Sequence, residues 1–142
     1  KYDYKLRWIE AVHGWLADEI KANPNLVVLG DFNIAPDDRD VHDPAVWNDD
    51  HILTSTAERD ALKRMYALGL HDAFRLHHQD GGIFSWWDYR MAGFRRDLGL
   101  RIDLTLVSDA LRERAHAAGI DREPRTWERP SDHAPAWVEL RD

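Results

Sequence analysis

Two polar residues that can do chemistry follow a short apolar run. Asp31 and Asn33 come directly after residues 26–29 (LVVL) and Gly30. They are two positions apart on an extended segment, so their side chains emerge on the same side. A carboxylate there can accept a proton from water or hold a hard cation, and an amide can donate to charge developing on a phosphoryl oxygen. The pair fits a phosphate site, although an Asx-type turn at a strand end explains these residues equally well.

A second pattern, near the end of the chain, joins a carboxylate to an imidazole. Asp132 and His133 are adjacent. The carboxylate can bind a divalent cation while the imidazole contacts a phosphate, and a second carboxylate such as Asp103 can fix the tautomer of the imidazole. Taken alone, Asp103 is better explained as a solvent-facing strand residue or as the partner of Arg101. The hypothesis of a site therefore depends on whether Asp103 and His133 meet in the fold.

An aromatic segment and several arginines lie between these two patterns. Residues 83–89 (IFSWWDY) alternate aromatic and polar side chains, and Arg90, Arg95 and Arg96 follow them. Most aromatic side chains of a strand belong to the core, but one or two can line a pocket that stacks on a base or a sugar. Aromatic surface beside positive charge is the combination that nucleic-acid grooves use.

The composition sets limits on the class of protein. The chain has 142 residues, enough for one domain, and 44% of them are hydrophobic, which suffices for a core without cross-links. It has no cysteine, which excludes disulfides and cysteine-ligated zinc and fits a reducing cytoplasm. No apolar run is long enough to cross a membrane. Taken alone, the formal net charge of −7 argues against a dedicated nucleic-acid-binding surface, which is usually basic, yet arginines cluster locally at residues 90–101.

Apolar periodicity and turn residues predict the elements that must position these side chains. The predicted helices span residues 4–22, 55–69 and 109–119, the predicted strands span residues 26–29, 83–89, 100–107 and 134–140, and residues 35–53 form a polar loop. The continuous apolar run of the first strand indicates burial on both faces. This order of elements predicts an α/β or α+β layered domain. The first helix begins almost at residue 1 with no strand before it, which suggests a chain that starts within a larger fold.

Four motifs appear in an order that resembles one known family. They are residues 29–34 (LGDFNI), 84–90 (FSWWDYR), 99–104 (GLRIDL) and 130–135 (PSDHAP). Together they resemble the exonuclease III-type apurinic/apyrimidinic endonucleases of the endonuclease/exonuclease/phosphatase superfamily, over nearly the whole chain. The first and last motifs specify little beyond phosphoesterase chemistry, whereas the two central ones are more particular to the DNA-repair branch. The resemblance implies a hydrolase that uses Mg²⁺ or Mn²⁺ to cleave DNA at abasic sites and to trim 3′ ends in base excision repair.

The resemblance also implies a role for each matching residue. Asp31 is similar to the group that orients and deprotonates the attacking water, and Asn33 to the amide that stabilises the transition state. Asp103 is similar to the carboxylate that aligns the histidine, and His133 to the histidine on the scissile phosphate. Asp31, Asn33 and Asp132 are implied at the metal site.

Contacts to DNA are implied for a further group of residues. Trp86, Leu100 and Ile102 fall where the family shapes its pocket for the abasic sugar. Arg90 and the loop that leads to Gly99 fall where the family engages the DNA. His133 would contact the phosphate itself.

The family's fold is a four-layered α/β sandwich, and the resemblance covers only its second half. Residues 1–142 are therefore expected to be a C-terminal half, a mixed or antiparallel sheet with flanking helices, of weak or no activity alone. The first half of the family supplies an asparagine, a metal-binding glutamate and a catalytic tyrosine that match no position here. An apolar face is expected where that half would pack. The expected full-length enzyme is a cytoplasmic monomer that acts on double-stranded DNA with abasic sites or 3′ ends, and not on membranes.

Two other functions fit part of the pattern. A superfamily phosphatase or phospholipid phosphodiesterase would share Asp31, Asn33, Asp132 and His133 but would need no DNA groove. The aromatic segment and the arginines argue against it. A non-catalytic half-domain that binds DNA or a partner is the other alternative, because the glutamate and the tyrosine are missing.

Overall fold

The computed structural model describes residues 1–142, and its strands pair only in antiparallel fashion. The α-helices are α1 (Tyr2–Ala22), α2 (Thr56–Tyr66), α3 (Ala73–His77) and α4 (Asp109–Arg112). The strands are β1 (Val27–Asp31), β2 (Leu70–Asp72), β3 (Trp86–Trp87), β4 (Gly99–Leu100), β5 (Asp103–Ser108), β6 (Ala115–Ile120) and β7 (Ala136–Leu140). Three 3₁₀ turns complete the structure: η1 (Asp38–Asp40), η2 (Arg90–Ala92) and η3 (Glu123–Thr126). No helix is long and apolar enough to span a membrane.

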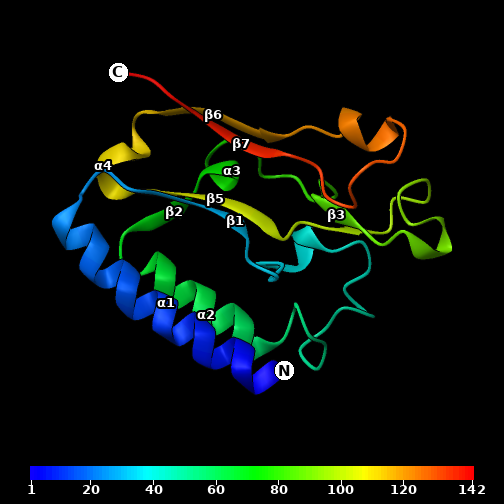
Figure 1. Ribbon diagram of the computed structural model, residues 1–142, viewed down its shortest axis with the longest axis horizontal. Helices are drawn as coiled ribbons and strands as arrows, with labels where there is room; N and C mark the ends of the chain where they lie inside the picture. Colours follow the sequence, from blue (N-terminus) through cyan, green and yellow to red (C-terminus); the bar gives the residue numbers. More distant parts are fainter.

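The main sheet has the order β1-β5-β2, with helices α1 and α2 side by side on one of its faces (Figure 1). The two helices form where the amphipathic periodicity predicted them, because each buries one apolar stripe against the sheet. The core between these layers contains Ile9, Leu16, Ile34, Ala61, Leu62, Met65, Leu70, Leu104 and Leu106. The predicted α/β or α+β class, a mixed or antiparallel sheet with flanking helices, is confirmed, and the sheet is of the antiparallel kind.

The hairpin of β6 and β7 forms a second layer beyond the main sheet (Figure 1). The predicted helix at residues 109–119 is therefore wrong after its first turn, since α4 ends at Arg112 and β6 begins at Ala115. The alanines there favour a helix locally, but Ala115 and Ala118 are small enough to pack closely beneath α3, in a cluster with Ala73. Tertiary packing thus overrides helix propensity.

The aromatic segment is extended over fewer residues than predicted, because only Trp86 and Trp87 form strand β3. Trp86 pairs with Leu100 of β4 and also forms an isolated bridge with His133. Trp87 is fully buried and packs in a small cluster with Phe84 and Ala134. The segment consequently joins the chain before β5 to the chain before β7.

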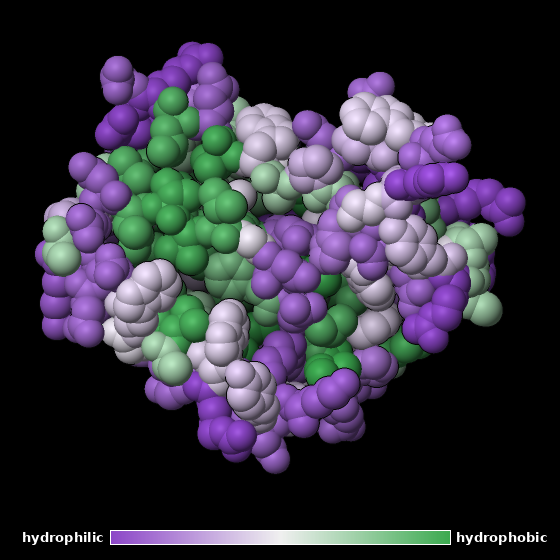
Figure 2. Space-filling model, in the orientation of Figure 1, coloured by the Kyte–Doolittle hydropathy of each residue, from purple (hydrophilic) through white to green (hydrophobic).

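Strand β1 forms as predicted, but the expectation that both its faces are buried is wrong within residues 1–142. It is an edge strand of the main sheet, and Leu29 is 65% exposed. Leu140 of β7 is also exposed. Figure 2 shows hydrophobic residues gathered over the region where β1, β5 and β7 lie. The helices cover the opposite face of the sheet, so no element of this chain shields Leu29 from water.

Candidate active site

Two carboxylates meet at one end of the main sheet. Strand β1 ends at Asp31, strand β5 begins at Asp103, and the antiparallel register pairs these two residues directly. Side chains that are paired in this way point to the same face, with Cβ atoms about 4.5–5.5 Å apart. Residues that are far apart in the sequence therefore share one site because of the strand register.

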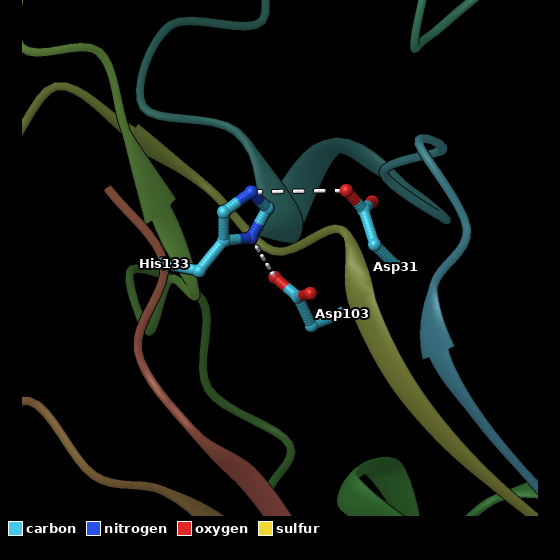
Figure 3. A group of neighbouring side chains, drawn as sticks. All are labelled: Asp31, Asp103 and His133. Atoms are coloured by element: carbon cyan, nitrogen blue, oxygen red, sulfur yellow. Dashed lines mark hydrogen bonds and ion pairs between the residues drawn. The ribbon is translucent and has the colours of Figure 1, made fainter. Parts of the chain in front are cut away.

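His133 lies between these two carboxylates (Figure 3). Its Nδ1 is 2.8 Å from Oδ2 of Asp103, and its Nε2 is 3.7 Å from Oδ2 of Asp31. An ionised carboxylate only accepts hydrogen bonds, so Nδ1 of His133 carries the hydrogen and donates it to Asp103. This bond fixes the tautomer and the orientation of the ring, and it leaves Nε2 directed towards Asp31.

Asp132 also reaches this nitrogen. Its Oδ1 is 4.0 Å from Nε2 of His133, and its Oδ2 accepts a hydrogen bond of 3.1 Å from the indole of Trp86. The backbone N–H of Trp87 donates to the carbonyl of Asp132 at 3.1 Å. The aromatic segment therefore holds both the backbone and the carboxylate of Asp132.

Asn33 occupies a tight turn just after β1. Its φ is +52°, and its backbone N–H donates to Oδ1 of Asp31 at 2.9 Å. The Asx-type turn, given above as the alternative to a phosphate site, is therefore present. It does not exclude the site, because the amide group of Asn33 is exposed and forms no hydrogen bond within the chain. Lys5 of α1 fixes the turn by donating to the backbone carbonyl of Asn33.

The three carboxylates of the site differ in their exposure to water. Burial raises the pKa of the Asp103 carboxyl above its ordinary value, and hydrogen bonds from His133 and Ser85 oppose that shift. The side chain of Asp103 is only 15% exposed, whereas those of Asp31 and Asp132 are 36% and 38% exposed. Asp103 is therefore placed to orient the imidazole, while Asp31 and Asp132 are placed to meet water, substrate or a cation.

The oxygen-rich side of the cluster fits a hard divalent cation. Asp31, Asp103 and His133 each offer a possible ligand atom, and these atoms lie within 4.8 Å of one another. The bond between Asp103 and His133 already uses one oxygen and one nitrogen of that set. Around that bond, the partly exposed carboxylates of Asp31 and Asp132 and the exposed amide of Asn33 offer oxygen atoms, the kind of ligand that Mg²⁺ and Mn²⁺ prefer.

A hollow of about 480 Å³ opens beside Asp31 and Asn33, and α1 contributes Tyr4 and Trp8 to its wall. A second hollow, of about 240 Å³, lies beside Asp103 and His133 and is lined in part by strands β1 and β7. The site is therefore open from two sides.

The structure does not place Leu100 and Ile102 on an open pocket. Both are buried, at 0% and 2% exposure, in a small cluster with Ala35 and Val41. The physical reason is that Trp86, the partner of Leu100 in the β3–β4 pair, packs with Trp47 and Leu53 against the cluster that contains Leu100 and Ile102. Of the three residues implied for the sugar pocket, only Trp86 is partly exposed.

Arg90 lies away from the cluster, at the start of η2 in an exposed loop. Its guanidinium group is 85% exposed and forms an ion pair of 2.7 Å with Asp88. Met91 and Ala92 follow it in left-handed backbone conformations, with φ of +60° and +53°. The loop therefore presents Arg90 and Met91 to solvent, and Arg90 forms its ion pair with Asp88 and not with a residue of the cluster.

Arg101 is not the partner of Asp103, which corrects one of the explanations considered above. Its side chain is 1% exposed and binds Oδ1 of Asp40 and Oδ2 of Asp72, both at 2.6 Å. Arg101 lies between β4 and β5, and its ion-pair partners are Asp40 and Asp72, whereas the partner of Asp103 is His133. Asp103 is consequently left free for His133.

Comparison with known proteins agrees with this site. The profile of the endonuclease/exonuclease/phosphatase family matches residues 1–133. The chain belongs to this family. It is 41% identical over 127 residues to exodeoxyribonuclease III of Haemophilus influenzae, an alignment that covers 85% of the chain and 47% of that protein. Similarity at this level extends the family assignment to relatives of the exonuclease III type.

Two solved structures of the family carry the same fold. A 3′ phosphatase, NExo from Neisseria bound to product DNA hairpin, superposes with a TM-score of 0.96 at 43% identity, over 99% of this chain and 54% of that one. An AP endonuclease from Archaeoglobus fulgidus superposes with a TM-score of 0.91 at 35% identity, over 98% and 54%. This family member spans about half the length of the relatives that it matches. The resemblance drawn from the four sequence motifs is confirmed.

Proposed function

We propose that residues 1–142 are the C-terminal half of a metal-dependent DNA phosphodiester hydrolase of the exonuclease III type. The parent enzyme would cleave at abasic sites and trim 3′ ends of double-stranded DNA in base excision repair, as a cytoplasmic monomer. The observation that carries the proposal is the cluster of Asp31, Asp103 and His133, which three distant segments bring together. The names of the relatives, exodeoxyribonuclease III and AP endonuclease, support DNA as the substrate.

Each side chain of the cluster has a chemical task in this reaction. Asp31 accepts the proton of the attacking water. Asn33 donates from its amide to a phosphoryl oxygen. Asp103 accepts a hydrogen bond from Nδ1 of His133 and holds the ring so that Nε2 faces the phosphate. Mg²⁺ or Mn²⁺, held by Asp31, Asn33 and Asp132, would supply positive charge against the phosphoryl oxygens.

The site of this chain is one side of a larger site in the proposed enzyme. Mg²⁺ requires near-octahedral oxygen ligation, and the chain supplies few ligands for it. The exposed Leu29 of β1 and the hydrophobic area that Figure 2 shows over β1, β5 and β7 fit a face that a further half would cover. The part of the protein encoded upstream of Lys1 would then add the missing carboxylate.

The test uses the full-length protein that contains residues 1–142, with an abasic duplex and Mg²⁺. The Asp31→Asn variant should cleave roughly 100- to 10,000-fold more slowly, because it lacks the general base. Asp60→Asn serves as the control, since Asp60 is exposed on α2 and forms no ion pair. If Asp31→Asn cleaves as fast as the control, the role assigned to Asp31 is wrong.

Two further measurements separate this proposal from its alternatives. A substrate panel of abasic duplex, 3′-phosphorylated duplex, inositol phosphate and sphingomyelin should show a preference for DNA. Turnover of the lipid or inositol substrate above that of DNA would favour a phosphatase or phospholipid phosphodiesterase instead. Residues 1–142 alone should be weak or inactive, and turnover at the full-length rate would contradict the proposed division into halves.

A further inference from the structure

Ser85 connects the chain segments that carry the site. It is fully buried and lies just before β3. Its backbone N–H donates to the carbonyl of Leu100 at 3.0 Å, and its carbonyl accepts from the N–H of Ala134 at 2.8 Å. Its hydroxyl oxygen accepts the N–H groups of Ile102 and Asp103, both at 3.0 Å. One residue therefore joins the start of β5 to the residue that follows His133.

The Ser85 hydroxyl still has its one hydrogen to donate. A serine hydroxyl has two lone pairs and one hydrogen, and the two backbone N–H groups occupy the lone pairs. Burial raises the pKa of the Asp103 carboxyl, and a hydrogen bond from the Ser85 side chain is one of the causes that lower it, which agrees with a hydroxyl hydrogen on that side. That carboxylate in turn accepts from Nδ1 of His133 at 2.8 Å. The contacts thus run from Ser85 to Asp103 and from Asp103 to His133, whose Nε2 faces Asp31.

We propose that Ser85 is a positioning residue for the reaction: it holds the Asp103 carboxylate in the orientation that fixes His133. The proposal rests on the proposed function, because the imidazole is the group that would contact the phosphate. Ser85 itself touches neither substrate nor cation. Its effect passes through the hydrogen bonds that its hydroxyl accepts from the backbone N–H groups of Ile102 and Asp103 at the start of β5.

Strand β5 provides a matched comparison at its other end. Ser108 is also buried, at 1% exposure. Its hydroxyl accepts the N–H of Leu26 at 3.0 Å and donates to the carbonyl of Pro24 at 2.6 Å. Like Ser85, it ties β5 to neighbouring chain through a buried hydroxyl, but it contacts no residue of the site. A purely structural role would thus make the two serines behave alike.

The first test compares Ser85→Ala with Ser108→Ala in the full-length protein, by steady-state cleavage of an abasic duplex and by thermal unfolding. Both variants should unfold at lower temperature. Only Ser85→Ala should lower kcat, by about 10- to 100-fold with KM changed less than about threefold, as for residues that orient a reacting group. Ser85→Thr keeps the hydroxyl and should recover most of kcat. Equal kcat values for the two alanine variants would overturn the proposal.

A second readout does not depend on turnover. The ¹⁵N shifts of the His133 ring, assigned with His133→Gln, should show Nδ1–H as the main tautomer, and Ser85→Ala should mix the two tautomers. Unchanged ¹⁵N shifts in Ser85→Ala would contradict the positioning role, whether or not the protein cleaves DNA. Absence of phosphodiester cleavage by the full-length protein would refute only the proposed function. If Ser85→Ala does not fold, Ser85→Cys keeps a similar volume with a poor acceptor and should give the same loss.

Discussion

Replacing Arg101 by methionine should destabilise the protein more than any change on its surface. The guanidinium group is fully buried between Asp40 and Asp72, which are 0% and 9% exposed. Methionine fills a similar volume and can keep a sulfur contact with the ring of Phe74, over which the guanidinium lies at 4.7 Å. The substitution therefore removes the charge and its hydrogen bonds with little change in packing.

The expected size follows from what remains after the substitution. Asp40 keeps one cation, since Nη2 of Arg75 lies 2.5 Å from its Oδ1. Asp72 loses the two hydrogen bonds that it accepts, of 2.6 and 3.2 Å, and is left as a nearly buried, unpaired carboxylate. Removing one partner of a buried ion pair costs about 3–5 kcal/mol. A loss of that size is a large fraction of the roughly 5–15 kcal/mol of a typical domain.

Urea unfolding of the full-length protein measures this loss, and a double-mutant cycle tests its cause. Adding Asp72→Asn to Arg101→Met removes the unpaired charge, so the double variant should be more stable than the sum of the single changes predicts, by about 0.5–3 kcal/mol. A cost for Arg101→Met below about 1 kcal/mol, the range of exposed ion pairs, would refute the reasoning. Strict additivity of the two substitutions would refute it as well.

Three further predictions concern single contacts. Trp86→Phe removes the indole donor to Asp132 and should raise the Mg²⁺ concentration for half-maximal cleavage at least about tenfold, in a metal titration. Burial lowers the pKa of His42, whose neutral Nε2 accepts a hydrogen bond from Trp47. The contribution of His42 to stability is therefore complete above about pH 6.5 and falls as the pH falls below that value. The Tm of His42→Gln should accordingly drop less than that of the unmutated protein from about pH 7.5 to 5. Gly30→Ala should cost about 1–3 kcal/mol in urea unfolding through its φ of +143° alone, since no atom lies within 4 Å of the added Cβ.

The long elements of the fold could be predicted because one pattern decides each of them. Helices α1 and α2 bury a single apolar stripe, and strand β5 follows a short-period alternation, so their positions agree with the prediction to within a few residues. Strand β2 and helix α3 were not predicted, since three and five residues are too few for any period to be visible. Strand β6 was predicted as helix because its alanines carry a local preference that only contact with α3 and β7 reverses.

The chemistry of the site was visible in residue types, whereas its supporting contacts were not. Asp31, Asp103 and His133 were identified as a possible group, and the structure brings them together. Nothing in the sequence indicates that Asp40, within a stretch of many acidic residues, is the one that binds Arg101. Ser85 likewise has no distinguishing sequence signal, because its importance comes from four hydrogen bonds to distant backbone.

The register between β1 and β5 explains why the sequence could suggest the site but could not establish it. Side chains alternate between the faces of a strand, so a shift of one residue in this pairing would move Asp103 to the face opposite Asp31. The observed pairing of Asp31 with Asp103 is maintained by apolar side chains of the same strand, since Leu104 and Leu106 must face the helices for the core to close. The same packing that buries these leucines therefore places Asp103 where His133 can bind it, and the hydrophobic core selects the geometry of the polar cluster.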